Sequence, residues 1–216
     1  EEKLLKAADG GLCVQCHQDF MKEAEGGVNH MPFAGGMCLS CHDPHGSNVK
    51  GMAASALGPL CGSCHDQIEK AAKGARSRHK PVAASECTQC HNPHKARLPA
   101  LLLAKSPELC LTCHKDMKAR MEKDNVHQPA ARDCLRCHTP HASAQDALLI
   151  RAIQPTCLEC HNPQRATFSK AHLGIEATAM NCRSCHDPHA SKDPKFFKAN
   201  IHMPFGARAC DECHLP

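Results

Sequence analysis

The sequence predicts a mostly irregular chain with short α-helices, built from a repeat of about 48 residues and wrapped around material other than protein. Three observations lead to this prediction. The 216 residues include 18 cysteines and 18 histidines but no tryptophan or tyrosine, and only six phenylalanines. Every cysteine belongs to a C-x-x-C-H motif, and these motifs recur at regular steps. With so few large apolar side chains, protein alone cannot fill an ordinary core.

The same composition argues against two classes of function. The net charge of +4 is spread along the chain without a basic block, and aromatic residues make up 3%, so nucleic-acid binding is not indicated. No apolar run approaches the roughly 18 residues of a transmembrane helix, and the longest is about Ala100–Ala104. The sequence opens without a charged and then apolar leader, so we expect that a signal peptide has been removed.

Nine motifs share one pattern, in which two cysteines three residues apart are followed at once by a histidine. They are Cys13-Cys16-His17, Cys38-Cys41-His42, Cys61-Cys64-His65, Cys87-Cys90-His91, Cys110-Cys113-His114, Cys134-Cys137-His138, Cys157-Cys160-His161, Cys182-Cys185-His186 and Cys210-Cys213-His214. This is the attachment pattern of c-type haem. On one helical turn, the two thiols can bond the vinyl groups of a porphyrin while the histidine lies beneath its iron. We therefore expect nine covalently bound c-type haems (heme c), with the motif histidines as proximal ligands.

Structural zinc and disulfide bonds are the alternatives. Pairs of C-x-x-C about 20 residues apart also suit zinc, and 18 cysteines could form a disulfide framework. Histidine is one residue in twelve of this chain, so its presence after all nine pairs does not arise by chance. A four-cysteine zinc site does not require it, and haem is therefore favoured.

Nine further histidines equal the expected haems in number and fall in two repeated positions. One set follows a motif in C-H-x-P-H: His45, His94, His141 and His189. The other set lies 7 to 10 residues before the first cysteine of a motif: His30, His79, His127, His172 and His202. We expect these nine to be distal ligands. A C-H-x-P-H histidine lies three residues from its own proximal histidine, with the porphyrin in the way, so we expect it to ligate a neighbouring haem.

The repeating unit carries two motifs. The first cysteines of motifs 2, 4, 6 and 8 are 47 to 49 residues apart. We predict one multihaem domain over residues 1–216, with repeats at approximately 30–75, 79–123, 127–165 and 172–216. An extra N-terminal motif occupies residues 1–29.

Helices are expected after the odd-numbered motifs, at Gln18–Glu25, Asp66–Lys73 and Lys115–Lys123. Ser106 followed by Pro107 predicts the N-cap and first turn of a helix that carries the fifth motif. The even-numbered motifs are instead followed at once by proline, which ends a helix. These prolines are Pro44, Pro93, Pro140 and Pro188.

The seventh motif departs from this pattern. It is odd-numbered but carries Pro163, and Gln164 stands where the even-numbered motifs have a histidine. We do not count Gln164 as a ligand. The linkers contain two short apolar pieces, Ala100–Leu103 and Ala147–Ile150, which we expect to pack against a haem face.

The stretch C-H-N-P-H-K-A-R-L-P-A-L-L-L-A-K-S-P-E-L-C-L-T-C-H, residues 90–114, resembles the doubled C-x-x-C-H multihaem cytochrome family, and the resemblance covers about residues 30–216. The family includes the periplasmic pentahaem donor to nitrite reductase and the decahaem cytochromes of outer-membrane porins. It implies low-spin, bis-histidine haems in a linear stack. The odd total of nine and the unit with Gln164 are departures. In composition alone, the chain is also similar to extracellular cytochrome filaments.

We therefore expect an electron-transfer protein, not an enzyme, that carries respiratory electrons across or beyond the outer membrane. Haem c is attached outside the cytoplasmic membrane, so we expect an exported protein, in the periplasm or at the cell surface. Its partners would be other redox proteins, extracellular acceptors, a porin, or further copies in a nanowire filament. In a filament, a distal histidine could be donated between copies.

Two alternatives stay open. One is a monomeric periplasmic shuttle or a conduit inside a porin. The other is a multihaem reductase, which needs one open haem and hence a vacant distal position such as that of His172. The chain has no C-x-x-C-K motif and no tyrosine for a haem cross-link, which are features of known multihaem enzymes.

Overall fold

The fold is known from a computed structural model, which describes residues 5–21 and 27–213. His214 of the ninth motif lies outside these residues, and Cys210 is described by its backbone alone. The chain divides into two compact units. The first comprises Glu1–Lys105 with Pro140–Ser143, and the second comprises Ser106–Thr139 with Ala144–Pro216.

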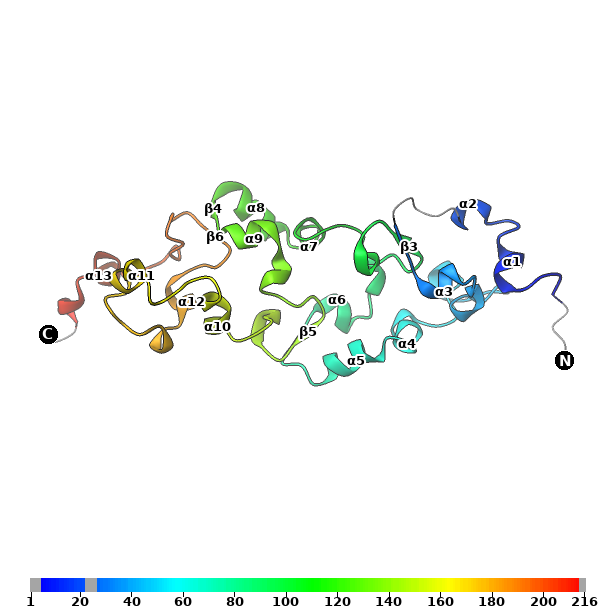
Figure 1. The fold of residues 1–216 in the computed structure, drawn as a ribbon, viewed down its shortest axis with the longest axis horizontal. Helices are drawn as coiled ribbons and strands as arrows, with labels where there is room; N and C mark the ends of the chain where they lie inside the picture. Colours follow the sequence, from blue (N-terminus) through cyan, green and yellow to red (C-terminus); the bar gives the residue numbers. More distant parts are fainter. Residues whose placement is uncertain (1–4, 22–26, 214–216) are drawn as a thin grey trace. The chain divides into compact units, whose positions relative to one another are not determined.

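Short helices joined by irregular segments make up both units (Figure 1). The α-helices of the first unit are α1 (Asp9–Cys13), α2 (Gln18–Met21), α3 (Met31–Ala34), α4 (Leu57–Gly62), α5 (Asp66–Lys73) and α6 (Lys80–Ala83). Its 3₁₀ helices are η1 (Cys38–Ser40), η2 (Lys50–Met52), η3 (Cys87–Gln89) and η4 (Pro99–Leu101). Its strands are β1 (Val28–Asn29), β2 (Ser77–Arg78), β3 (Lys95–Ala96) and β5 (Ala142–Ser143). The α-helices of the second unit are α7 (Glu108–Leu111), α8 (Lys115–Lys123), α9 (Gln128–Arg132), α10 (Ile153–Leu158), α11 (Ala166–Ala171), α12 (Cys182–Cys185) and α13 (Met203–Ala207). Its 3₁₀ helices are η5 (Cys134–Arg136), η6 (Asp146–Leu148), η7 (Ala177–Ala179) and η8 (Cys210–Glu212). Its strands are β4 (Asn125–Val126) and β6 (Ala190–Ser191). Within the described ranges, we find no helix that is both long and apolar enough to cross a bilayer.

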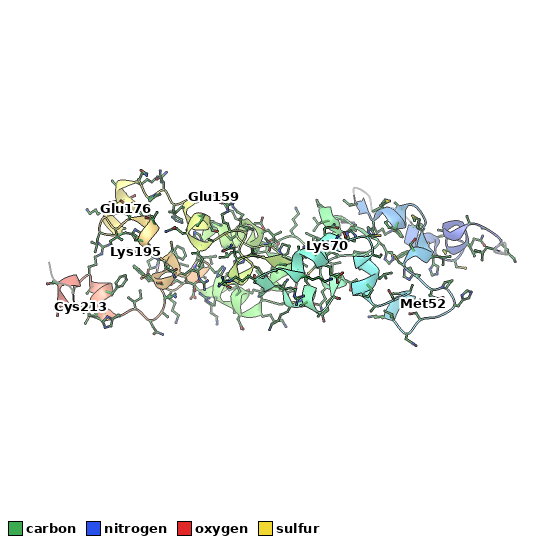
Figure 2. All side chains as sticks on the ribbon, turned by 90° about the horizontal axis from the view of Figure 1, so that it is seen from below. Met52, Lys70, Glu159, Glu176, Lys195 and Cys213 are labelled. Atoms are coloured by element: carbon green, nitrogen blue, oxygen red, sulfur yellow. The ribbon has the colours of Figure 1, made fainter. Side chains whose placement is uncertain are left out.

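The protein atoms alone form almost no core. Among the described residues, the buried apolar side chains are the alanines at 53, 72, 177 and 190, and no large side chain is fully buried. The accessible surface of the chain is 15896 Å². A globular protein of this mass exposes about 9,700 Å². Side chains project from the ribbon along its whole length (Figure 2). The prediction of a mostly irregular chain with short helices is confirmed, and the excess surface is consistent with a non-protein filling.

Each described motif folds as a single helical turn. In motifs 1 to 8, the backbone N–H of the histidine donates to the carbonyl of the first cysteine at 2.9–3.1 Å. Residues four apart on such a turn lie on one face, with the second cysteine beside them. Two thiols and one imidazole are thus presented together, as c-type haem attachment requires.

The predicted helices are largely confirmed. The ranges of α5 and α8 equal the predicted ones, and α2 covers the start of the predicted Gln18–Glu25, of which residues 22–25 lie outside the described part. The prediction for Ser106 was wrong. Pro107 is the cap of α7, and the Ser106 hydroxyl instead accepts a hydrogen bond from the backbone N–H of Cys134 at 2.9 Å. The helix also ends at Leu111, before the fifth motif is complete.

After each even-numbered motif, the chain turns back and pairs with the motif histidine. Isolated antiparallel bridges join His42 to Ala53, His91 to Leu102, His138 to Leu149 and His186 to Phe197. The apolar pieces Ala100–Leu103 and Ala147–Ile150 therefore contribute backbone pairing to the motif. Their packing against a haem face stays a prediction.

Three strand pairs bring distant histidines together. They are β1–β3, β2–β5 and β4–β6, all antiparallel. Each pair joins the two residues before a leading histidine to the two residues after a C-H-x-P-H histidine. The backbone N–H of the first histidine donates to the carbonyl of the second in His30–His94, His79–His141 and His127–His189, at 2.8, 3.0 and 2.9 Å. We call each of these three arrangements a histidine clamp.

Motif 1 is held beside motif 2 by a close contact between Gly10 of α1 and Gly36, which lies two residues before η1. A Cβ added at Gly10 would lie 2.7 Å from the Cα and 2.8 Å from the carbonyl oxygen of Gly36, so the backbone itself would have to shift. A Cβ added at Gly11 would meet only the Cβ of Ala7, at 3.9 Å.

We predict that Gly10→Ala separates α1 from η1 and lowers the free energy of unfolding by about 1–3 kcal/mol, the usual range for overpacking. Gly11→Ala is the matched control and should be neutral or slightly stabilising, because alanine is favoured over glycine in a helix by about 1 kcal/mol. Thermal unfolding of the two purified holoproteins, followed by circular dichroism, measures the difference. Equal effects of the two substitutions would contradict this packing.

Candidate haem sites

Six motif histidines each face a histidine from outside the motif. The ring centroids of five such pairs are 5.9–6.1 Å apart, with the ring planes 10–29° from parallel. These pairs are His65–His30, His42–His94, His91–His141, His161–His127 and His138–His189. A sixth pair, His186–His172, has centroids 6.3 Å apart and rings at 65°.

This spacing fits one iron between two imidazoles. A metal–imidazole bond is about 2 Å long and the ring centroid lies about 1 Å behind the bonding nitrogen, so two trans ligands place their centroids about 6 Å apart. The relative rotation of the two planes is free about the axis through the metal. All six pairs meet this requirement, and in each of them one histidine follows a C-x-x-C pair.

Backbone carbonyls orient the motif histidines of the even-numbered motifs. A carbonyl only accepts, so each bonded Nδ1 carries the proton and Nε2 is left for a metal. The acceptor lies nine residues after the histidine in all four cases: His42 with Gly51 at 2.9 Å, His91 with Ala100 at 2.7 Å, His138 with Ala147 at 2.9 Å and His186 with Lys195 at 3.0 Å. Lys195 is labelled in Figure 2.

Three of these carbonyls belong to residues in the left-handed conformation, and the fourth, that of Lys195, directly precedes Phe196, whose φ is 62°. Gly51 has a φ of 72°, and the non-glycine residues Ala100 and Ala147 have φ values of 53° and 55°. For an alanine, this conformation costs about 1–2 kcal/mol. The turn is therefore maintained against a local cost, and its carbonyl bond to the imidazole helps to offset that cost.

The leading histidines are oriented in the same way by the clamp. The Nδ1 of His30, His79 and His127 lies 2.9 Å from the carbonyls of Pro93, Pro140 and Pro188, respectively. The prolines of C-H-x-P-H therefore do more than end a helical turn. The Nδ1 of His172, in contrast, is bonded to the carbonyl of Phe168 one helical turn earlier, at 2.9 Å.

Three of the four C-H-x-P-H histidines, His45, His94 and His189, are aimed by an Asx turn. The side-chain oxygens of Asp43, Asn92 and Asp187 accept the N–H of the histidine two residues later, at 2.9–3.0 Å. In the seventh motif, Asn162 makes the same turn with the N–H of Gln164 at 2.8 Å. Motif 7 therefore shares the turn of the even-numbered motifs, although its first cysteine lies in α10, as that of motif 3 lies in α4.

Burial keeps several of these imidazoles neutral, which is the form that binds metal. Burial, and then the imidazoles of His42 and His30, lower the pKa of His94. Burial and neighbouring imidazoles act in the same direction on the pKa of His141 and His161. For His189, burial and then His138 lower the pKa, although the nearby Asp187 carboxylate opposes them.

An ion pair supports the clamp that contains His189. The guanidinium of Arg120, on α8, donates to the Asp187 carboxylate at 2.6 Å and also to the carbonyl of Ala190. Although burial opposes it, hydrogen bonds from the His189 and Ala190 N–H groups and from Arg120 lower the pKa of Asp187. The helix after motif 5 is in this way tied to the turn after motif 8.

Phenylalanine rings pack on the imidazoles. Phe20 and Phe33 lie 4.7 and 5.4 Å from the ring of His94, measured between centroids. In the second unit, Phe168 lies 4.2 Å from His172 and Phe197 lies 4.9 Å from His186. The few aromatic residues of this chain are thus concentrated at the histidine pairs.

Cysteines of successive motifs lie beside one another. The first cysteines of motifs 3 and 4, 5 and 6, and 7 and 8 are hydrogen-bonding partners, namely Cys61–Cys87, Cys110–Cys134 and Cys157–Cys182. The second cysteines of motifs 2 and 3 are also close together, as are those of motifs 6 and 7. Burial raises the pKa of Cys41, and the neighbouring Cys64 raises it further. Burial is also the largest cause of the raised pKa of Cys137, and Cys160 is one of the neighbouring groups that raise it. Within each unit, the motifs therefore follow one another in chain order.

The alternatives of zinc and disulfides find no support in the described ranges. None of the 17 cysteines with described side chains forms a disulfide. Across residues 5–21 and 27–213, no three or more histidine, cysteine or acidic side chains gather into a metal site. The histidines instead come together two at a time.

Three further predicted ligands, His17, His45 and His202, are exposed. His114 is the N-cap residue of α8, and His79 belongs to the second clamp. The ligand roles of these five histidines stay predictions. Neither the carbonyl acceptors nor the Asx turns were predicted from the sequence. The constant nine-residue spacing was available in the sequence, but the acceptor residues differ in type because their backbone makes the bond.

Repeated turns that attach c-type haem define a multihaem c-type cytochrome, a class of electron-transfer protein. The family model for the doubled CXXCH motif matches residues 30–70, 79–119, 127–166 and 176–201. These ranges cover more than half of the 216 residues, and the chain belongs to this family. A comparison with curated proteins found no match.

The Asx turns of Asn92 and Asn162 allow a matched test of how His94 is oriented. We predict that Asn92→Ala broadens the low-spin ferric haem signals in electron paramagnetic resonance, because His94 loses the hydrogen bond that fixes its backbone. Asn162→Ala removes the same turn at Gln164 and should leave the signals unchanged. Each substitution should cost about 1 kcal/mol of stability, the typical worth of one hydrogen bond. Identical spectra for both variants would show that the turn does not position a ligand.

Proposed function

We propose that the chain binds nine c-type haems, each between two histidines, and passes electrons along them over a long distance. The observation that supports this most directly is the set of six imidazole pairs with centroids 5.9–6.3 Å apart. The 18 motif cysteines would form the thioethers and the nine motif histidines the proximal bonds. The nine histidines outside the motifs would be the distal ligands.

A haem iron held by two imidazoles takes up and releases one electron without an open position for substrate. Burial lowers the pKa of four of the imidazoles, those of His94, His141, His161 and His189, and backbone carbonyls orient eight others. Because the cysteines of successive motifs lie side by side, the haem edges attached to them would be close. Within each unit, electrons would then follow the order of the motifs.

Haem c is attached outside the cytoplasmic membrane, so the proposed location is the periplasm or the cell surface. There the protein would receive respiratory electrons from one redox partner and deliver them across or beyond the outer membrane. A filament of many copies, a porin-bound conduit and a monomeric shuttle all use the same row of haems.

A multihaem reductase with one open iron is the second candidate. His172 was the residue whose long spacing left that possibility open. Its ring faces His186, its Nδ1 is held by Phe168, and the ring of Phe168 packs on it. These contacts favour a distal ligand over a vacant position, and hence electron transfer over catalysis at this motif.

We predict nine haems per chain by pyridine haemochrome assay and mass spectrometry, with low-spin spectra throughout. The reduced holoprotein should not bind carbon monoxide, because no iron has a free axial position. His172→Ala should open one haem in nine to carbon monoxide, seen as a shift of part of the Soret band. Gln164→Ala is the control and should leave carbon monoxide binding absent.

Fewer than nine haems in the natural protein would overturn the count. Carbon monoxide binding by the natural holoprotein would instead favour the second candidate function, a reductase with one open iron. Unchanged behaviour of the His172 variant would remove that residue from the ligand set.

A further inference from the structure

The histidine pair of motif 8 differs from the other five pairs in the angle between its rings. The planes of His172 and His186 stand at 65°, whereas those of the other pairs lie 10–29° from parallel. Both rings lie in the second unit, where the pairs of motifs 6 and 7 stand at 20° and 22°. Sites within one unit therefore differ in a property that acts directly on an iron between two imidazoles.

The crossed arrangement begins with the helix that carries His172. The clamp histidines lie next to a strand, but His172 is the C-cap of α11 (Figure 1). Leu173 follows with a left-handed φ of 56°, and the N–H of Gly174 donates to the carbonyl of Ser169 at 2.9 Å, a common closure of a helix. The Nδ1 of His172 is held by the carbonyl of Phe168. A helix end, and not a clamp, thus sets the plane of this ring.

Phenylalanine rings lie against the faces of both imidazoles. The ring of Phe168 is stacked on His172 with centroids 4.2 Å apart and planes at 29°, and that of Phe197 is stacked on His186 at 4.9 Å and 16°. The two phenylalanines that contact His94 instead meet it edge-on, at 77° and 64°. A ring stacked on the face of an imidazole opposes rotation about the axis through the metal. The two stacked rings therefore hold the planes crossed.

Phe197 occupies a position that is aliphatic after the other even-numbered motifs. It forms the backbone bridge to its motif histidine, as Ala53, Leu102 and Leu149 do after motifs 2, 4 and 6. The carbonyl that orients the motif histidine lies nine residues later in all four cases. The motif histidine is therefore oriented by the same bond at each site. What sets motif 8 apart is its distal ring and the phenylalanine stacked on its proximal ring.

The angle between two imidazole planes acts on the d electrons of the iron, because the axial ligands tune its reduction potential. Each imidazole donates π-electron density to the iron d orbital that matches the orientation of its ring. Parallel rings donate to the same orbital and raise it above its partner, which stabilises the electron vacancy of ferric iron. Crossed rings divide the donation between two orbitals, and this stabilisation is lost. An iron between crossed rings is therefore reduced more easily.

The charge next to motif 8 acts in the same direction. Residues 192–198, which follow this motif, contain three exposed lysines and one aspartate. The equivalent residues after motif 6, 144–150, contain one aspartate and no basic residue. Reduction adds one negative charge to a haem, so nearby cations favour the reduced state, by an amount that salt screens.

We propose that the crossed pair His172–His186 makes motif 8 the first site to be reduced among motifs 6, 7 and 8. Phe168 and Phe197 are the positioning residues that hold the pair crossed. The proposal rests on the bis-histidine electron transfer proposed above. One electron lost by the haem of motif 7 is gained at motif 8, and no bond forms or breaks. The first cysteines of these two motifs are hydrogen-bonding partners, so the two attachment points are adjacent. Electrons in this part of the chain would rest at motif 8.

Electron paramagnetic resonance of the full-length ferric holoprotein tests the geometry. Crossed imidazoles give a strongly anisotropic low-spin signal, whereas nearly parallel imidazoles give a rhombic one. The natural protein should show an anisotropic signal of one haem per chain that His172→Ala converts to a high-spin signal. His189→Ala and His127→Ala should each convert a rhombic signal and so assign motifs 6 and 7. In a reductive titration, the anisotropic signal should disappear before these two rhombic signals.

Substitutions of the phenylalanines test their positioning role. Phe197→Leu introduces the residue that motifs 4 and 6 have at this position, so the fold should be kept. It should shift the anisotropic signal toward the rhombic form and make motif 8 harder to reduce. Phe168→Leu should do the same, whereas Phe168→Tyr keeps the stacked ring and should behave as the natural protein. Phe196→Leu is the matched control, because the ring of Phe196 meets His127 edge-on, with centroids 5.5 Å apart. It should leave the signal of motif 8 unchanged.

The outcomes separate this inference from the proposed function. Low-spin haems throughout, with no anisotropic signal that depends on His172, would overturn the crossed geometry and leave the electron-transfer proposal intact. Reduction of motif 8 after motifs 6 and 7 would overturn its place as the first site reduced. A signal unchanged in both Phe168→Leu and Phe197→Leu would remove the positioning role. High-spin irons in the natural holoprotein would overturn the bis-histidine haems themselves.

Discussion

The hydrogen bond from an imidazole Nδ1 to a backbone carbonyl is the interaction on which the rest of this structure depends. It fixes the tautomer, sets the plane of the ring and leaves Nε2 pointing away from the chain. Four motif histidines and four histidines outside the motifs make it. Seven of the eight acceptors come from two recurring turns, and the eighth, which serves His172, is the carbonyl of Phe168 in α11. The irregular backbone exists to present carbonyls, which explains why little regular secondary structure is needed.

Histidine contacts between repeats take the place of a core. The clamp of His30 and His94 presents its two imidazoles to two different motifs, since His30 faces motif 3 and His94 faces motif 2. In the same way, His127 faces motif 7 and His189 faces motif 6. A two-residue strand pair is not stable alone. In the function proposed above, the histidines at its ends would be held by haems that are themselves bonded to the chain, so folding and haem attachment would be one process.

The sequence allowed the local features to be predicted, because they depend on neighbouring residues. The helices at Asp66–Lys73 and Lys115–Lys123 follow from composition directly after a motif, and the motif turn follows from the spacing of its ligands. Ser106 was misassigned because its hydroxyl bonds to Cys134, 28 residues away. The histidine pairing could not be predicted either. It depends on clamps whose members are more than 60 residues apart and whose strands are two residues long.

The register of the pairs shows that one spacing between imidazoles is reached by two routes. An even-numbered motif faces the C-H-x-P-H histidine of the following repeat, as in His42–His94 and His138–His189. Motif 8 instead faces His172, which comes from the segment just before it. The Nδ1 of His172 is held by the carbonyl of Phe168, one helical turn earlier, and not by a clamp. A clamp between distant residues and a single helical turn thus bring two imidazoles to the same spacing, as expected if the paired imidazoles, and not the route to them, are what the fold must supply.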